Sequence, residues 1–339
     1  MLALSRYLRV VTQFELSAPW SATARAALCY PEQSADKSVH SREVFNSKLH
    51  NISLRHGLTR IYTNKLTCGH SMNIDTKEAQ LREIFRELDS VIVAYSGGVD
   101  SSYVAYVANA ELGPRAVCIT GQSASLPAYQ RAELDRVVKQ FGFQHEVIQT
   151  EELDNPDYQA NNPNRCFFCK DELYSKLESV ARSRGIKHIV DGSTVDDLGD
   201  YRPGRQAAAE HAVRSPLIEV GLSKREVREL SRVATLPTWD KPASPCLSSR
   251  IAYGTTVTIE RLGKVDRGEE ILREFGFREF RVRHHDQLVR LEIAQAEMDG
   301  VLRKELIAEL ARRFRELGFK YVTLDLEGFR SGSMNEVLD

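Results

Sequence analysis

Apolar and polar residues follow clear periods from about Met72 onward. Apolar side chains recur at the spacing of one helix face at four positions, Leu81, Ile84, Phe85 and Leu88. Asp75 followed by Glu78 resembles a capping box, which predicts that this helix starts with Asp75 as its cap. The uninterrupted apolar run at 91–95 then predicts a strand that is buried on both faces.

The alternation of short apolar runs and amphipathic stretches continues to about residue 191. Strands are expected at 91–95, 116–120, 145–148 and 188–191, and helices at 101–111, 128–141 and 171–184. Buried strands that alternate with helices predict βαβ units, in which a parallel sheet carries helices on both faces. The predicted fold class is therefore α/β.

The chain changes character after a helix that begins at the capping box of Ser223 and Glu226 and runs to about Thr235. Residues 236–255 are rich in Pro, Ser and Gly and are expected to be irregular. Beyond them, helices are expected at 259–275 and 299–317, and strands at 279–283, 288–293 and 321–326. This pattern predicts a small α+β domain at the C-terminus.

These patterns divide the chain into three parts. Residues 1–71 lack a sustained period and are interpreted as a disordered extension or a mis-called gene start, with no part in the chemistry. Residues 72–250 form the α/β domain, and residues 251–339 form the α+β domain, which is expected to serve substrate binding or oligomerisation. A chain of 339 residues can hold two separate cores, since a domain takes roughly 100–200 residues.

Composition and charge exclude some classes of partner. The chain is 42% hydrophobic and 27% charged, with a formal net charge of −1. This balance provides no basic surface for nucleic acid, so no nucleic-acid partner is expected. No stretch reaches the roughly 18 uninterrupted apolar residues of a membrane span. No membrane association is expected, and the expected location is the cytoplasm.

A serine- and glycine-rich turn lies between the first expected strand and the helix that follows. It comprises Ser96, Gly97, Gly98, Val99, Asp100, Ser101 and Ser102. A helix N-terminus offers N–H donors and a partial positive charge, and glycine lets the backbone close around an anion. The Gly-Lys-Ser/Thr ending of a Walker loop is absent. We expect a phosphate-binding loop, and the alternative is an incidental turn before a helix.

The six cysteines are not expected to form a disulfide framework, because such frameworks suit small secreted domains. Cys166 and Cys169 form a CxxC motif that is expected in a loop just before a helix, and Cys246 lies in the irregular stretch 236–255. Three thiolates suit a [4Fe–4S] cluster with one open iron, or a catalytic thiol with two helpers, whereas structural zinc usually takes four protein ligands. The motif by itself leaves a zinc knuckle, a redox pair and idle thiols open.

Several stretches together resemble the LarE family of sulfur insertases, which help to build the nickel-pincer nucleotide cofactor of lactate racemase. The turn at 96–102 alone resembles the PP-loop of ATP pyrophosphatases, and the other stretches are specific to the family. They are residues 164–170, DGSTVDDLGDYRPGRQAA from Asp191, SPLIEVGLSK from Ser215, KPASPCLSSRIAYG from Lys241, FRVRHHD from Phe280 and FRSGSMNE near the C-terminus. The resemblance covers essentially Met72 to the end of the chain.

The resemblance implies a PP-loop fold and a two-step reaction on a small nucleotide. ATP, with Mg²⁺, adenylates a carboxylate of pyridinium-3,5-biscarboxylic acid mononucleotide and releases pyrophosphate. A sulfur nucleophile then displaces AMP to give a thiocarboxylate, and a second round treats the other carboxylate. This order is chemically sound, because a carboxylate is inert to sulfide until its oxygen becomes a good leaving group.

Members of the family differ in their sulfur source. In some, the cysteine that matches Cys246 gives up its own sulfur. In others, the cysteines that match Cys166, Cys169 and Cys246 bind a [4Fe–4S] cluster whose open iron holds hydrosulfide. Because this chain has all three cysteines, the cluster mechanism is expected, with a sacrificial Cys246 as the alternative.

Further site residues are carried over from the family. Arg281 and Arg283 would bind the substrate phosphate, for which guanidinium groups are well suited. They lie two apart on an expected strand and therefore share one face, although surface strands also carry such pairs for solubility. Glu269 also matches an acidic position of the family, as a substrate or metal ligand, with a solvated helix-surface glutamate as the alternative, and Arg250 is a further substrate candidate. Independently of the family, Asp191 is a candidate for ATP because it follows an expected strand, where open α/β sheets place ligands. Lys241 is expected to contact the pyrophosphate of ATP, with an exposed loop lysine as the alternative.

Three other functions are considered. A tRNA thiolase would share much of the chemistry, but the neutral charge argues against it. An amide-forming ligase would leave the cysteines without a role, and no glutaminase domain is visible. A non-catalytic nucleotide-binding module is the third. The expected partners are a small-molecule nucleotide substrate and further copies of the chain in a homo-oligomer, with a functional link to the nickel-insertion and carboxylase steps of the pathway.

Overall fold

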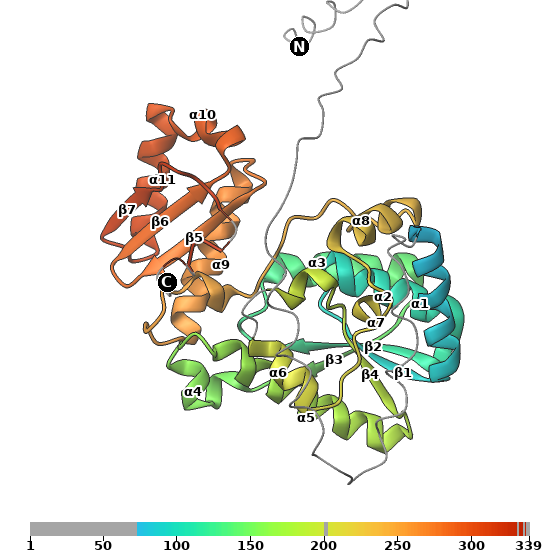
Figure 1. Ribbon diagram of the computed structural model, residues 1–339. Coiled ribbons are helices and arrows are strands. Elements are labelled where there is room, and N and C mark those ends of the chain that lie inside the picture. The colour runs from blue at the N-terminus through green and yellow to red at the C-terminus, as the bar shows by residue number, and fades with distance from the viewer. Residues whose placement is uncertain (1–72, 200–202, 331, 335, 337–339) are drawn as a thin grey trace, which may run out of the picture. The chain divides into compact units, whose positions relative to one another are not determined.

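The computed structural model describes residues 73–199, 203–330, 332–334 and 336 (Figure 1). The expected leader at 1–71 therefore lies outside the described residues. Within the described ranges, no helix is long and apolar enough to cross a membrane. Two sheets organise this part of the chain.

The larger sheet has four strands, all parallel, in the order β3-β2-β1-β4 (Figure 1). They are β1 (Val91–Ala94), β2 (Ala116–Gln122), β3 (Gln144–Gln149) and β4 (His188–Val190). From β1 the chain moves outward to β2 and β3 and then returns to β4 on the other side of β1. The order thus reverses between β1 and β4, where open α/β sheets bind ligands at the carboxyl ends of their strands. The predicted α/β fold class is confirmed.

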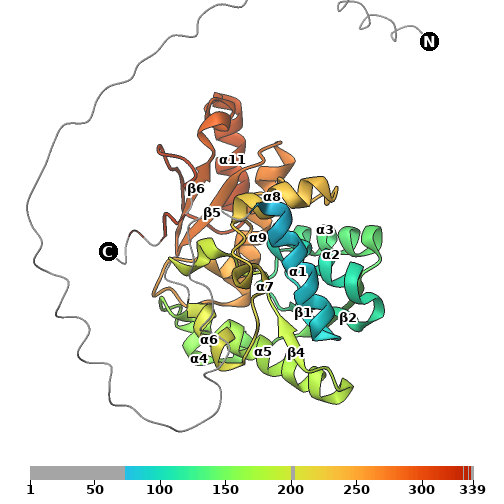
Figure 2. The ribbon, with the colours of Figure 1, turned by 45° about the vertical axis from the view of Figure 1, so that its right-hand side comes forward.

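Helices cover both faces of this sheet, because the apolar side chains of β1 are buried on both sides. The helices of this part are α1 (Ile74–Leu88), α2 (Val99–Leu112), α3 (Ala128–Phe141), α4 (Pro156–Gln159), α5 (Arg165–Arg184), α6 (Pro203–Glu210), α7 (Pro216–Glu219) and α8 (Lys224–Val233). On β1, Val91 and Val93 pack in the core under α1, α2 and α8, whereas Ile92 and Ala94 pack in the core beside α5 and α6. Figure 2 shows α1 and α5 on opposite sides of the strands.

Two helix starts test the predicted caps. Asn73 is the N-cap of α1, and its side chain accepts a hydrogen bond from the Asp75 N–H at 3.4 Å. The prediction of Asp75 as the cap was therefore wrong; Asp75 lies in the first turn, where its carboxylate faces the positive end of the helix dipole. The predicted capping box of α8 is confirmed, with reciprocal hydrogen bonds between Ser223 and Glu226.

The smaller sheet lies in the C-terminal part and is mixed. Its strands are β5 (Phe280–His285), β6 (Leu288–Ile293) and β7 (Tyr321–Leu324), with β5 antiparallel and β7 parallel to β6. Three helices pack with it around a separate apolar core: α9 (Ile259–Glu274), α10 (Met298–Val301) and α11 (Lys304–Glu316). The single helix expected at 299–317 is two helices, because the backbone of Arg303 is extended, with φ −75° and ψ 130°.

Candidate functional site

The serine- and glycine-rich turn lies where β1 ends and α2 begins. Gly97 has φ +69°, a conformation that glycine adopts without strain, and a Cβ there would lie 3.1 Å from Leu134. Ser96 and Ser101 face each other across the turn, with their hydroxyl oxygens 3.0 Å apart. Gly98 is the N-cap of α2, and no side chain among the described residues caps this helix start. The turn therefore presents a helix N-terminus, the backbone element that binds anions.

The end of β4 packs directly on this helix start. The remaining residues of the turn form the first turn of α2, and they are Val99, Asp100, Ser101 and Ser102. A Cβ at Gly192 would lie 2.7 Å from the Ser101 nitrogen, so only glycine allows this approach. The side chains of Ser101 and Ser102 are buried. The carboxyl ends of β1 and β4 therefore meet at the predicted phosphate loop, where the strand order reverses.

Asp191, the first residue after β4, has both carboxylate oxygens engaged. Its Oδ1 accepts from the Ser215 hydroxyl at 2.7 Å, and its Oδ2 accepts from the Ser193 hydroxyl at 2.8 Å. The side chain is buried. Asp191 thus ties together the loops that follow β4, beside the turn, and its part in binding ATP stays a prediction.

Lys241 reaches the same turn from the irregular stretch. Its ammonium donates to the Gly97 carbonyl oxygen at 3.2 Å and pairs with Glu133 at 2.9 Å. Arg228 fixes the backbone at this point by donating to the Lys241 carbonyl oxygen at 2.8 Å. The structure thus brings a cation to the predicted phosphate loop from a position far away in the sequence.

Cys166 and Cys169 lie in the first turns of α5, so the prediction of a loop before the helix was wrong. The helix begins at Arg165 because the two residues between the cysteines already pack on apolar cores. Phe167 contacts the core beside the large sheet, and Phe168 contacts the core of the small sheet. Cys166 is exposed and Cys169 is half-buried. The CxxC motif therefore stands at the boundary between two cores.

Cys246 comes to the same place from the irregular stretch, which is irregular as predicted and contains one 3₁₀ turn, Leu247–Arg250. Burial raises the pKa of Cys169, and the neighbouring Cys246 sulfur raises it further. The pKa of Cys166 is raised as well, first by desolvation from the side chains packed around it, although the residue remains accessible at the surface, and next by the Cys246 sulfur. The three thiols therefore lie within electrostatic reach of one another, although they come from two distant segments.

The three thiols are the type of ligand that an iron–sulfur cluster takes. No group of three or more His, Cys, Asp or Glu side chains in the described part of the chain is arranged to hold one metal ion. The ligands of a [4Fe–4S] cluster bind different irons and are spread around it, and thiolates are the ligands it takes. Three cysteines from two segments fit such a cluster with one iron left open.

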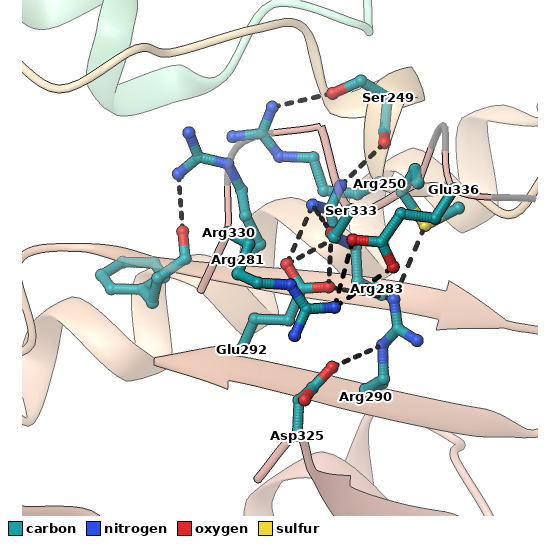
Figure 3. Close-up of polar contacts among 12 residues, drawn as sticks. Ser249, Arg250, Arg281, Arg283, Arg290, Glu292, Asp325, Arg330, Ser333 and Glu336 are labelled. Carbon is teal, nitrogen blue, oxygen red and sulfur yellow. Dashed lines mark hydrogen bonds and ion pairs between the residues drawn. The ribbon is translucent and has the colours of Figure 1, made fainter. Parts of the chain in front are cut away.

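A second polar cluster lies on β5 and β6 (Figure 3). Arg283 pairs with Glu292 at 2.9 Å and donates to the Ser333 hydroxyl at 2.9 Å. It also donates to the Ser249 carbonyl oxygen at 3.1 Å, which joins the cluster to the stretch that carries Cys246. Because Glu292 is fully buried, the charge of Arg283 is balanced by a carboxylate in the interior.

Arg281 has no such carboxylate partner among the described residues. It donates to the carbonyl oxygens of Phe280, at 2.6 Å, and Ala243, and its guanidinium lies 4.6 Å from the centre of the Phe329 ring. Burial, and next the charge of Arg250, lower the pKa of Arg281 to about 10. The side chain is 8% exposed, so the alternative of a surface pair for solubility is wrong. A buried guanidinium without an ion pair is a suitable anion ligand.

Arg250 and Glu269, both predicted substrate ligands, pair with each other. Glu269 also accepts from Arg273 at 3.3 Å. Arg250 in turn donates to the backbone carbonyl oxygens of Pro245 and Cys246. The structure therefore gives both residues a part in supporting the Cys246 backbone, and their contact with a substrate or metal stays a prediction.

Lys170 is a site residue that the sequence patterns did not single out. It follows Cys169 on α5, and its ammonium lies 5.4 Å from the centre of the Tyr174 ring. The Tyr174 hydroxyl donates to Asp191 at 3.5 Å, so Lys170 lies between the cysteines and the end of β4. The interaction with Tyr174 raises the pKa of Lys170, which therefore keeps its charge. The i, i+4 spacing of Lys170 and Tyr174 is the signal that could have indicated this pair.

Glu152 is a second such residue. Its carboxylate is buried and accepts from the Ser125 hydroxyl at 2.9 Å. After burial and Cys246, it is a further cause of the raised pKa of Cys169, which places it beside the thiols. No local pattern marks this residue, because the groups that surround it come from other segments.

The chain has relatives that match most of its length, although no protein-family model matches it. An uncharacterized protein of Synechocystis sp. is 46% identical over 265 residues, which cover 78% of this chain and 99% of that protein. The pyridinium-3,5-bisthiocarboxylic acid mononucleotide synthase of Lactiplantibacillus plantarum is 36% identical over 266 residues, 78% of this chain and 95% of that protein. An uncharacterized protein of Methanocaldococcus jannaschii is 28% identical over 251 residues, 74% of this chain and 94% of that protein.

Proposed function

The chain belongs to the LarE family, and from this we propose that it is an ATP-dependent sulfur transferase. Its substrate is pyridinium-3,5-biscarboxylic acid mononucleotide, whose two carboxylates it converts into thiocarboxylates. Each conversion consumes ATP and releases AMP and pyrophosphate. The product is destined for the nickel-pincer cofactor, which links the protein to the carboxylase and nickel-insertion steps of that pathway.

One observation carries the proposal: a single irregular stretch contacts the phosphate loop and the polar cluster of Arg281 and Arg283, and it brings Cys246 within electrostatic reach of the α5 thiols. Lys241 donates to the loop at Gly97. Cys246 follows in the same stretch and lies within electrostatic reach of the thiols of α5. Ser249 then accepts from Arg283 through its carbonyl oxygen. The groups suited to ATP, sulfur and substrate phosphate are therefore linked through one short length of backbone.

In the first step, the turn at Gly97 would hold the β- and γ-phosphates of ATP, which enters as its Mg²⁺ complex. The N-terminus of α2 and the hydroxyls of Ser96 and Ser101 offer donors, and Lys241 adds positive charge. An oxygen of the substrate carboxylate attacks the α-phosphorus, and the bond to pyrophosphate breaks. Donors aimed at the leaving pyrophosphate stabilise the charge that develops on it.

In the second step, a sulfur nucleophile attacks the adenylated carboxyl carbon, a C–S bond forms and the bond to the AMP oxygen breaks. Cys166, Cys169 and Cys246 would hold a [4Fe–4S] cluster, which when bound supplies hydrosulfide. Arg281 would bind the phosphate of the mononucleotide, because its charge has no carboxylate partner in the described structure. Arg250 would keep the backbone of Cys246 in place.

The test uses the full chain, purified without oxygen and assayed with ATP, Mg²⁺, the biscarboxylate substrate and sulfide. We expect pyrophosphate release that depends on the substrate, and a thiocarboxylate product in the mass spectrum. Cys246→Ser should keep pyrophosphate release and lose the thiocarboxylate, because adenylation does not use the thiol. Cys118→Ala is the matched control and should keep both, since Cys118 is buried in β2.

The outcomes separate the alternatives. Bound iron and acid-labile sulfide, with repeated turnovers, would support the cluster mechanism. A chain without iron that loses the mass of one H₂S at Cys246 after a single turnover would support the sacrificial mechanism. Absence of substrate-dependent pyrophosphate release contradicts the proposal, and thiolation of tRNA or amide formation from ammonia would point to another PP-loop enzyme.

A further inference from the structure

The two segments that carry the cysteines are fastened to each other by buried hydrogen bonds. Arg165, which precedes Cys166, is 4% exposed, and its Nη1 donates to the Ser248 carbonyl oxygen at 2.9 Å. Ser248 lies in the 3₁₀ turn that follows Cys246. One guanidinium therefore joins the backbone beside Cys246 to the start of the helix that carries the CxxC motif.

Asn161 holds this guanidinium in place. Its Oδ1 accepts from the same Nη1 of Arg165. Its Nδ2 donates to three carbonyl oxygens beyond the 3₁₀ turn: Ile251 at 3.2 Å, Ala252 at 2.8 Å and Thr255 at 3.0 Å. Asn161 is fully buried and has φ +56°, a left-handed conformation that asparagine adopts more readily than most residues. This one amide thus fastens the segment before Cys166 to the segment after Cys246.

Tyr158 adds a second link between the same segments. Its hydroxyl oxygen lies 2.5 Å from that of Ser248, and both side chains are buried. Burial raises the pKa of Tyr158, and the nearby Cys246 and Cys169 raise it further, which places the link beside the thiols. The fastening therefore acts at the sulfur site itself, through residues other than those assigned to ATP or to the substrate.

We propose that Arg165 is a positioning residue that sets the separation between Cys246 and the two cysteines of α5. This inference rests on the proposed function, in which the three thiols act together. A guanidinium suits the task because one terminal nitrogen carries two donors, here directed at two buried oxygens. Without it, the Ser248 carbonyl and the Asn161 side chain would be left buried with fewer donors, which favours movement of this segment toward water.

Thiol cross-linking in the reduced, metal-free full chain tests this directly. Dibromobimane joins thiols only when they lie close together, and peptide mass spectrometry distinguishes a link from Cys246 to α5 from a link between Cys166 and Cys169. The wild-type chain should form both. Arg165→Gln should lower the yield of the link to Cys246 about tenfold, the order expected when a buried hydrogen bond to a charged group is lost. The link within α5 should be unchanged, because the helix alone sets that spacing.

Two further variants control the experiment. Arg182→Gln removes an exposed arginine in the last turn of the same helix and should behave as the wild type. Arg165→Lys keeps the charge but not the forked donor, so its yield should be intermediate, and it carries the test if the melting curve shows that Arg165→Gln does not fold. Equal yields of the link to Cys246 in the Arg165 variants and in Arg182→Gln would overturn the proposal. A wild-type chain that never forms this link would overturn it too.

The positioning role of Arg165 and the proposed function can fail independently of each other. The cross-link needs neither ATP nor substrate nor iron, so a chain that makes no thiocarboxylate can still show the effect of Arg165. Conversely, the wild-type chain can make the thiocarboxylate while Arg165→Gln leaves the yield of the cross-link to Cys246 unchanged. That result would uphold the proposed function and refute the positioning role of Arg165. If both the cluster mechanism and the positioning role of Arg165 are correct, anaerobic reconstitution should leave Arg165→Gln with less bound iron than Arg182→Gln.

Discussion

Arg250 and Glu269 form an ion pair that is closed off from solvent. Their side chains are 0% and 1% exposed, and the Nε of Arg250 lies 2.8 Å from the Oε1 of Glu269. Through Nη1, the same guanidinium donates to the Cys246 carbonyl oxygen at 3.0 Å. The pair joins α9 to the stretch that carries the proposed sulfur site, so it bears on both stability and chemistry.

Removing one partner of this pair should be strongly destabilising. Glu269→Gln leaves the charge of Arg250 buried without its carboxylate, and we expect the free energy of unfolding to fall by about 3–5 kcal/mol in denaturant titrations. Glu270→Gln is the matched control, since Glu270 pairs with Arg267 at 2.7 Å with the two side chains 52% and 67% exposed. That variant should lose less than about 1 kcal/mol. Equal losses in the two variants would contradict the assignment.

Arg281 is the opposite case, because its buried charge has no carboxylate partner in the described part of the chain. Arg281→Met should leave the melting temperature nearly unchanged or raise it, as expected when a buried charge is replaced by an apolar group. The KM for the mononucleotide should rise about 10- to 100-fold, the order of one hydrogen-bonded charge contact, while the KM for ATP stays the same.

Arg283→Met is the control for this prediction. It removes one of the two arginines that pair with the fully buried Glu292, the other being Arg290 at 3.0 Å, and should therefore lower the melting temperature. An Arg281→Met enzyme with an unchanged KM for the mononucleotide, or with both KM values raised alike, would show that Arg281 does not bind the substrate.

Gly192 should tolerate no side chain. In Gly192→Ala, the added Cβ would lie 2.7 Å from the Ser101 nitrogen, so the end of β4 must move away from the phosphate loop. We expect a loss of about 1–3 kcal/mol in stability, together with weaker ATP binding in a thermal-shift titration. Gly199→Ala is the control, because a Cβ at Gly199 would meet no atom of the described residues within 4 Å. Normal ATP binding by Gly192→Ala would refute this view of the loop.

His211 gives the fold a defined dependence on pH. Its ring nitrogens lie 2.9 Å from Asp171 and 2.9 Å from Glu178, both on α5. Burial disfavours the charged ring, but the hydrogen bonds to the two carboxylates outweigh burial and raise the pKa of His211. The charged ring is therefore favoured in the folded state. Its stabilisation is complete below the ordinary histidine pKa of about 6.5 and is lost as the pH rises through the higher pKa of the folded chain.

The measurement is the melting temperature of the wild type and of His211→Gln across this pH range. The advantage of the wild type should shrink as the pH is raised above about 6.5. His188→Gln should still lose stability as the pH rises, as the wild type does. Burial lowers the pKa of His188, so this residue has the opposite pH dependence and is not the source of the loss. A difference between wild type and His211→Gln that does not change with pH would rule out this role.

Local patterns in the sequence determined the architecture of the large sheet. The run at 91–95, which contains β1, and the serine- and glycine-rich turn after it could be predicted because both depend on residues within a few positions of each other. The same holds for the capping box of Ser223 and Glu226. The cap of α1 could not be predicted in this way, since Asn73 and Asp75 are both good cap residues and the choice depends on how the chain enters the helix.

Only the tertiary structure decided which distant groups meet. The spacing of Arg281 and Arg283 indicated a shared face, but the buried Glu292, which pairs with Arg283 and not with Arg281, comes from the neighbouring strand. In the same way, α5 begins before the CxxC motif because Phe167 and Phe168 pack on cores that exist only in the folded chain. The periods of helices and strands arise from neighbours along the chain, whereas burial and charge pairing arise from segments that come together on folding. The sequence therefore determined which elements and chemical groups are present, and the fold decided which of those groups are buried, paired and brought to one site.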